Sequence, residues 1–160
     1  MKWILAVIVF CLSAFAANGQ SLINDRPKVA LSIVAVSDSV KVGRPIMLRI
    51  TVTNNQEKAQ KMLIDKPVLW AFTGNVADLK TGQSVLSYSN RAMSTSQVYQ
   101  EKDLKDFYHV LKPGQSITTE QDLRGIVIFN TLDYKLPKGA YKMHLDYYGN
   151  TSNAIIFYVD

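Results

Sequence analysis

Cysteine is almost absent from this chain, and its absence removes several classes of protein. The 160 residues contain one cysteine, eight glycines and five prolines, and 19% of them are charged. One thiol excludes an intrachain disulfide and a cysteine-based metal cluster, and the glycines lack the three-residue period of collagen. Because 48% of the residues are hydrophobic, the chain is too apolar for a disordered protein, and its length suits a single domain.

Catalytic motifs are missing as well. The sequence has no H-E-x-x-H zinc motif, no G-x-S-x-G nucleophile elbow and no phosphate-binding loop followed by a helix. A metal site would need both histidines, His109 and His144, to converge from distant strands. The carboxylates of residues 101–106 alternate with lysines, which is typical of a solvated surface. We therefore predict a protein that is not an enzyme, with no catalytic residue, cofactor or metal.

The first 17 residues have the organisation of a secretory signal peptide. Lys2 supplies the positive n-region, residues 3–12 form an unbroken apolar run, and residues 14–16 give the A-x-A cleavage signal. The apolar run is shorter than a membrane-spanning helix requires. Cys11 lies inside the run rather than at a lipoprotein cleavage point. We expect a secreted or periplasmic protein that is cleaved after residue 17, or as late as residue 19, and then has no membrane span.

Removal of the leader changes the composition of the remaining chain. It takes away the cysteine together with Lys2, and the net charge falls from +5 to +4. We expect a short N-terminal segment at 18–27 and one domain over 28–160. A net charge of +4 affects solubility and is not the footprint of a nucleic-acid-binding protein, so we predict no nucleic-acid partner.

Apolar residues of the mature chain recur with a period close to two. Residues 46–53 are the clearest case, because Ile46, Leu48, Ile50 and Val52 point to one side of an extended chain. Other strands are predicted at 29–36, 67–73, 84–89, 116–123, 141–148 and 154–159. About seven strands with turns between them predict an all-β fold, an antiparallel immunoglobulin-like β-sandwich without a disulfide. A closed barrel is the alternative.

Two segments have a less regular pattern. Residues 126–129 form either a strand or a buried loop. The spacing of Leu104, Phe107, Tyr108 and Leu111 favours a short helical turn.

The C-terminal part of the chain resembles the tyrosine corner of immunoglobulin-like sandwiches. Gly139 lies two residues before Tyr141, and Met143 stands where antibody domains place their second cysteine. Trp70 lies on the predicted third strand, where such folds often bury an indole. The resemblance implies that the Tyr141 hydroxyl bonds to upstream backbone and that apolar packing replaces the disulfide.

A longer succession of short motifs covers nearly the whole mature chain. These motifs are Val52-Thr53-Asn54, residues 111–116, Asp122-Leu123, Tyr134, Gly139, Tyr141 and Ser152-Asn153. Their order is similar to the non-catalytic β-domain beside secreted zinc peptidases of the deuterolysin and peptidyl-Lys type, also found in stand-alone bacterial secreted proteins. The resemblance implies an accessory immunoglobulin-like domain. It implies no peptidase activity, because the peptidase half and its zinc motif are missing from this sequence.

Loops are the predicted binding elements. In an immunoglobulin-like sandwich the B–C and F–G loops share one end, and here they correspond to 54–66 and 149–153. The candidate partner-binding residues in or beside these loops and in 90–106 are Lys58, Lys61, Lys66, Arg91, Tyr99, Tyr148 and Asn150. We predict that they bind a protein or a cell-envelope component; for each loop the alternative is a solvated connection.

Two other functions stay open at this stage. The protein is alternatively a proteinase inhibitor that presents the segment 90–106. It is alternatively a carbohydrate-binding module, in which tyrosine rings stack on sugars; the candidates are Tyr88, Tyr99, Tyr108 and Tyr148.

Overall fold

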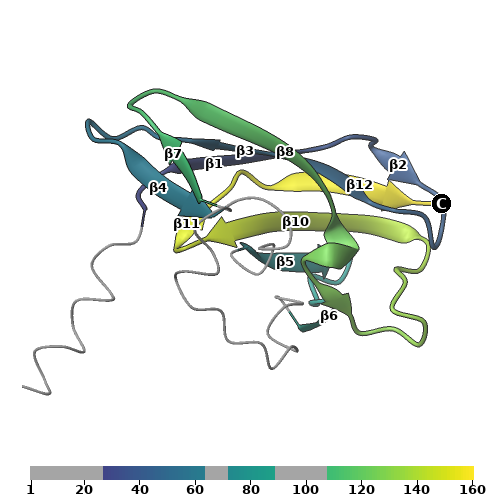
Figure 1. Ribbon diagram of the computed structural model, residues 1–160. Helices are drawn as coiled ribbons and strands as arrows, with labels where there is room; N and C mark the ends of the chain where they lie inside the picture. Colours follow the sequence, from purple (N-terminus) through teal and green to yellow (C-terminus); the bar gives the residue numbers. More distant parts are fainter. Residues whose placement is uncertain (1–26, 64–71, 89–107) are drawn as a thin grey trace, which may run out of the picture.

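The computed structural model describes residues 27–63, 72–88 and 108–160, and these residues are mostly in strands (Figure 1). The strands in chain order are β1 (Ala30–Ala35), β2 (Ser39–Val40), β3 (Met47–Thr53), β4 (Gln60–Leu63), β5 (Phe72–Asp78), β6 (Leu86–Tyr88), β7 (Tyr108–Leu111), β8 (Ser116–Asp122), β9 (Ile128–Phe129), β10 (Gly139–Tyr147), β11 (Asn150–Thr151) and β12 (Ile155–Val159). A single turn of 3-10 helix, η4 (Leu123–Gly125), follows β8. The predicted leader, Lys66, Trp70, Arg91 and Tyr99 lie outside the described residues.

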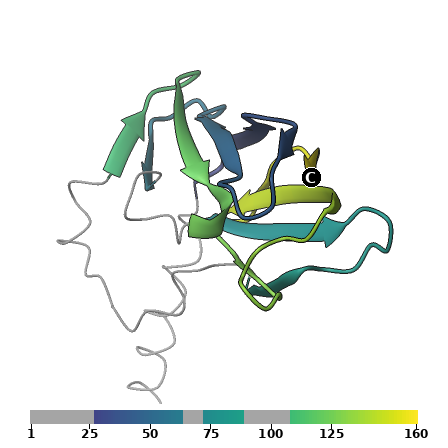
Figure 2. The same cartoon turned by 90° about the vertical axis from the view of Figure 1, so that its right-hand side faces the viewer.

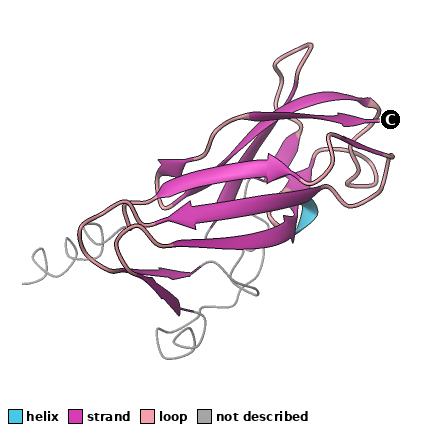
Figure 3. Cartoon of the chain, turned by 90° about the horizontal axis from the view of Figure 1, so that it is seen from above, coloured by secondary structure: helices cyan, strands magenta, loops and turns pink. Residues whose placement is uncertain are grey.

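Two main sheets form the sandwich (Figure 2). In one, β3 pairs with β1 on one side and with β8 on the other, all antiparallel. In the second, β10 pairs with β5 on one side and with β11 and β12 on the other, and β2 runs parallel to β12. This is the A-B-E and C-F-G grouping of an immunoglobulin-like sandwich, so the predicted fold is confirmed. Figure 3 shows the strands running between two ends of the molecule, with η4 near one of them.

The core lies between these sheets because each strand turns alternate side chains inward. In β3 the inward residues Leu48, Ile50 and Val52 are buried, and the residues between them face outward. In β10 the inward residues include Leu145 and Tyr147, which are fully buried. Each large apolar side chain that leaves water contributes about 1.5–3 kcal/mol, so packing alone supplies the cohesion that antibody domains supplement with a disulfide.

The tyrosine corner is present at the start of β10. The Tyr141 hydroxyl donates a hydrogen bond of 2.8 Å to the carbonyl of Pro137, and the Tyr141 ring stacks on Phe157 with 5.5 Å between centroids. Gly139 makes room for this ring, because a Cβ at that position would lie 3.3 Å from the Tyr141 hydroxyl oxygen. Met143 is buried between its neighbours on β5 and β12, where the resemblance placed apolar packing in place of a disulfide.

Several boundaries differ from the sequence predictions. Tyr108–Leu111 is strand β7, paired with β4, and not a helical turn. The interval 54–66, predicted as a loop, contains strand β4. The strand predicted at 67–73 is described only from Phe72, and as β5 it continues beyond the predicted end to Asp78. The strand predicted at 84–89 was expected to pair with the third strand, but β6 within it pairs with β9. One isolated bridge, between Ala77 and Ser84, joins β5 to the residues just before β6. These differences share a cause, because pairing with strands distant in sequence overrides the local pattern.

Candidate functional site

The pair β4–β7 lies at the same end of the sandwich as β11 (Figure 1). Among the described strands these two pair only with each other. Met62 and Leu111 are buried, so one face of the pair packs on the core. Lys61 and Val110 are partners on the other face, and Val110 is 63% exposed. The pair is therefore fixed to the core on one side and open to solvent on the other.

Asn54 holds this pair in place. It is fully buried, and its Nδ2 donates hydrogen bonds to the carbonyls of Lys58 (2.9 Å) and Leu111 (2.8 Å). Its Oδ1 accepts a hydrogen bond of 3.0 Å from the Gln56 amide. Its backbone also exchanges hydrogen bonds with the β7–β8 turn, through Gly114 and Gln115. A buried amide with every group paired specifies one arrangement of its neighbours.

Lys61 and Tyr108 meet on the open face. The Lys61 Nζ lies 3.8 Å from the centroid of the Tyr108 ring, which is cation–π geometry and contributes about 0.5–1 kcal/mol at such a site. Burial raises the pKa of Tyr148, and the charge of the Tyr108 phenolate adds to this rise to a smaller extent. Lys61 of β4 and Tyr108 of β7 are therefore in contact on this face, and the β10–β11 turn with Tyr148 lies at the same end of the molecule (Figure 1).

Tyr148 belongs to a tight turn with an unusual backbone. Tyr148 (φ 47°) and Gly149 (φ 84°) are the two loop residues between β10 and β11, as in a type I′ hairpin turn. Glycine adopts this region freely, whereas a tyrosine in it carries strain of about 1–3 kcal/mol. The Tyr148 ring packs edge-on against Tyr147, with 4.8 Å between centroids, and Tyr147 in turn lies 5.0 Å from Phe72. A partly exposed ring thus stands on a buried aromatic base.

Asn150 has its polar atoms engaged within the fold. Its Nδ2 donates to the carbonyls of Pro27 and Tyr147, both at 2.8 Å, and its Oδ1 accepts from the Val29 amide at 3.1 Å. Asn153 binds the edge of β1 in the same way, through both the amide and the carbonyl of Ile33. These asparagines attach the N-terminal stretch to the hairpin, so Asn150 has a structural role, and its predicted binding role stays a prediction.

The structure thus brings together part of the predicted set. Lys61 and Tyr148 lie at the same end, and Lys58, which is exposed, lies just before β4. Sequence reasoning did not predict the role of Asn54 in holding the β4–β7 pair, nor the contact of Tyr108 with Lys61. The aromatic side chain of Tyr108 marked it as a possible binding residue. Its contact with Lys61 could not be predicted, because β4 and β7 are distant in sequence.

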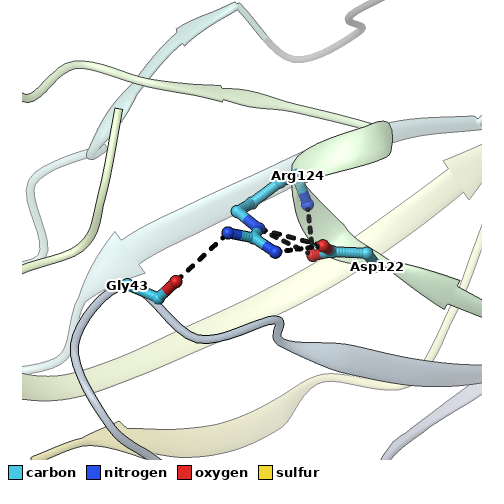
Figure 4. A network of polar contacts seen from close by, with 3 residues as sticks. All are labelled: Gly43, Asp122 and Arg124. Atoms are coloured by element: carbon cyan, nitrogen blue, oxygen red, sulfur yellow. Dashed lines mark hydrogen bonds and ion pairs between the residues drawn. The ribbon is translucent and has the colours of Figure 1, made fainter. Parts of the chain in front are cut away.

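The opposite end carries a different polar cluster (Figure 4). Arg124 of η4 binds Asp122 through Nη2 (2.6 Å) and Nε (2.9 Å to Oδ2), and its Nη1 donates to the carbonyl of Gly43 at 3.3 Å. The hydrogen bond to the Asp122 carboxylate raises the pKa of Arg124 above its ordinary value, so the guanidinium stays charged. Asp122 also accepts from the Arg124 amide and caps η4. This cluster ties the turn before β3 to the end of β8.

The histidines lie on separate strands. His144 on β10 has its Nε2 3.7 Å from Asp146 Oδ2, and His109 on β7 is paired with Met62. In the ranges 27–63, 72–88 and 108–160, no three His, Cys, Asp or Glu side chains gather as a metal site would require. Within the same ranges no helix has the length and apolar character needed to cross a membrane.

The chain matches no family model and no curated protein. Among solved structures it is similar to a Pseudomonas fluorescens alkylpurine DNA glycosylase, AlkC, bound to DNA containing an abasic site analog. That match has a TM-score of 0.47 and 17% identity, and covers 88% of this chain and 33% of the glycosylase chain. It is also similar to a Listeria innocua beta-glucosidase in complex with laminaribiose, with a TM-score of 0.45 and 11% identity over 83% of this chain and 16% of that one.

Proposed function

We propose that this protein is a non-enzymatic, secreted or periplasmic immunoglobulin-like module that binds a protein partner through the β4–β7 end. The binding surface consists of Lys61, Tyr108, Val110 and Tyr148, and we call it the aromatic–lysine surface. The observation that carries the proposal is the solvent-facing side of the β4–β7 pair, where Lys61 lies over the Tyr108 ring and Val110 is exposed. Tyr148, a partly exposed tyrosine with a strained backbone, lies at the same end. Strained backbone is retained mainly where function requires it.

The chemistry of the surface supports a protein as the partner. Tyrosine provides large contact area with few rotatable bonds, and it is enriched in protein interfaces and antibody loops. Val110 adds an exposed apolar side chain on the same face as Lys61. The lysine charge favours an acidic partner surface. The leader predicted from residues 1–17 and the resemblance to accessory β-domains support an exported module of this kind.

The carbohydrate alternative is less well supported at this surface. A sugar ring stacks on the face of an aromatic side chain, and Lys61 occupies one of the two faces of Tyr108. Stacking of a sugar on that face would require the lysine to leave its position. A protein partner can instead contact the lysine and the tyrosine together.

A site-specific photo-cross-linker tests the proposal. It is placed at position 110 in the full chain, expressed in the organism that encodes it, and compared with the same group at position 34. Val34 is a matched control, because it is a valine on a strand face with 57% exposure and lies on β1. We expect a discrete protein adduct from position 110, none from 34, and loss of the adduct when Tyr148→Asn is added. Adducts of equal yield from both positions, or none from position 110, would contradict the proposal.

Tyr148→Asn is the informative variant because it separates binding from folding. Asparagine tolerates the left-handed backbone better than most residues, so the turn is kept while the ring is removed. An adduct that persists unchanged in this variant would remove Tyr148 from the binding surface.

A further inference from the structure

The loop between β9 and β10 carries the most exposed apolar side chain of the described residues. Leu132 is 102% exposed, so its side chain has no neighbours that cover it. Tyr134, two residues later, is 62% exposed and has a left-handed backbone with φ 52°. The Tyr134 amide donates to the Thr131 carbonyl at 3.0 Å, which closes a tight turn with Leu132 at its tip.

This tip has a fixed base. Phe129 before the loop and Leu136 within it are both buried in the core. The carbon chain of Lys135 lies against the turn before β3, because a Cβ on Gly43 would be 3.4 Å from the Lys135 Cδ. The base is also next to the Arg124 cluster, which holds the same turn. A tip with a fixed base loses little conformational entropy when it makes a contact.

Cationic side chains surround the base. A small depression beside the loop has four basic residues in its lining, Lys41, Arg44, Arg124 and Lys135, over an apolar floor that includes Phe129 and Leu136. Lys138, also exposed, precedes β10 at this end.

Four acids lie nearby and offset part of this charge; one of them is Asp78, the strand partner of Tyr141 at the start of β10. Asp122 is paired with Arg124 at 2.6 Å, and Asp133 lies 3.6 Å from Lys135. Asp160 lies beside Val42, whose amide donates to the Asp160 carbonyl. Five basic residues face these four acids, and Lys41, Arg44 and Lys138 are outside the two ion pairs, so a small excess of positive charge remains around the tip.

We infer that this end, which we call the η4 end, docks reversibly on an anionic phospholipid surface. Leu132 and Tyr134 enter the interfacial region of the bilayer, and Lys41, Arg44, Lys135 and Lys138 contact the headgroups. An apolar tip within a collar of cations fits such a surface, since leucine gains from burial, tyrosine prefers the interface and each cation adds attraction. A single tip of this size gives weak binding that depends on salt. The inference does not depend on the partner at the β4–β7 end.

Vesicle co-sedimentation tests it directly. The probe is the exported chain, recovered after removal of its leader, mixed with vesicles of phosphatidylglycerol and phosphatidylcholine in equal parts or of phosphatidylcholine alone. We expect binding to the anionic vesicles that falls as salt rises, and much less binding to the neutral ones. Absence of binding to anionic vesicles at low salt, or equal binding to both compositions, would overturn the inference. An apolar pocket of another protein would then be the better partner for Leu132.

Variants locate the contact on the molecule. Leu132→Asp should weaken vesicle binding by about tenfold or more, because it removes the apolar anchor and adds a negative charge. Lys41→Glu should weaken it by at least about fivefold, and Lys61→Glu, the same charge change at the β4–β7 end, should leave it nearly unchanged. Equal losses from the two lysine variants would show unspecific attraction of a basic protein and overturn the inference.

A fluorescent label gives a second test, which reports which end of the molecule contacts the vesicle without weakening the binding. The only cysteine lies in the leader, so Leu132→Cys and Val110→Cys each provide one labelling site in the exported chain. An environment-sensitive dye at position 132 should shift to the blue on anionic vesicles, whereas the dye at 110 should not. A shift of the same size at both positions would contradict docking through the η4 end.

Discussion

The two ends of the sandwich each hold a tyrosine in the left-handed region, but they use it differently. At the β4–β7 end, Tyr148 is 36% exposed and stands on the buried ring of Tyr147. At the η4 end, Tyr134 is 62% exposed and lies beside Leu132, at the tip of a loop. The first ring is held by aromatic packing, and the second projects from a base that is held by an ion pair.

The difference indicates two kinds of recognition. Packed side chains with a fixed arrangement select a partner by shape as well as by the charge of Lys61, and charges that become buried in an interface are screened by salt less than exposed ones. An apolar tip among cations selects a surface by charge, and this attraction is screened over a Debye length of about 8 Å at physiological salt. Protein binding at the β4–β7 end should therefore persist at a salt concentration that releases the protein from anionic vesicles.

The largest expected loss of stability comes from Asn54, the buried residue that holds the β4–β7 pair. Asn54→Ala removes the partners of the Lys58 carbonyl, the Leu111 carbonyl and the Gln56 amide, and should lower the free energy of unfolding by about 3 kcal/mol. Urea denaturation measures the loss. Asn55→Ala, at the exposed neighbouring asparagine, is the control and should change stability by less than about 0.5 kcal/mol. Equal effects of the two variants would mean that Asn54 does not hold the pair.

A smaller effect is expected from the polar cluster at the other end. Arg124→Met removes the contacts to Asp122 and Gly43 and should cost about 1.5 kcal/mol in unfolding free energy. The cost is below that of a buried ion pair because both side chains are about one-third exposed. Thermal or urea unfolding checks this. A change of more than about 3 kcal/mol would show that the η4 end depends on its polar contacts as strongly as the β4–β7 end does.

The tyrosine corner, which supports the base of the η4 end, gives the next effect. Tyr141→Phe loses the hydrogen bond to Pro137 and should cost about 1 kcal/mol at neutral pH. Burial, with a further effect of Asp78, raises the pKa of Tyr141 in the folded state, so its contribution is complete below the unfolded pKa of about 10 and is lost as the pH rises through the folded value. The difference in stability between wild type and Tyr141→Phe should therefore shrink in urea titrations above pH 10. A difference that stays constant there would contradict this account.

The smallest expected change in stability is that of Tyr148→Asn, and it distinguishes a binding residue from a core residue at the β4–β7 end. Tyr148→Asn relieves backbone strain and loses packing on Tyr147, so the net change in unfolding free energy should stay within about 0.5 kcal/mol. Tyr134→Asn should behave alike at the η4 end. A loss of more than about 2 kcal/mol from Tyr148→Asn would make its ring part of the core rather than of the binding surface.

Most of the sandwich could be predicted from the sequence because its strands are half-buried. Alternation placed β3 and β10 to within a few residues, since one face of each is apolar and the other polar. The fold prediction failed where this pattern was absent. Tyr108 and Leu111 have helical spacing, and only the pairing with β4 makes them a strand. Gly74 also weakens the pattern of β5, where the Val127 side chain leaves no space for a Cβ.

The candidate site was predictable only in part. Lys61 and Tyr148 could be assigned to one end because loops of this fold cluster there. The contact through Tyr108 could not, since it depends on a strand pair whose members are distant in sequence. Asn54 has the residue type of a turn, and nothing in its neighbours reveals that its amide is buried. Arg124 was not predicted, because its contact with the Gly43 carbonyl joins residues that are distant in sequence.

The central claim is that the aromatic–lysine surface binds a protein, and an affinity comparison tests it most directly. The partner found by cross-linking is titrated in solution, without lipid, against Lys61→Glu and Lys138→Glu, which change the charge equally at the two ends. We predict that Lys61→Glu weakens binding by at least about tenfold and that Lys138→Glu leaves it unchanged within about twofold. Equal losses from the two variants, or no loss from Lys61→Glu, would contradict the claim.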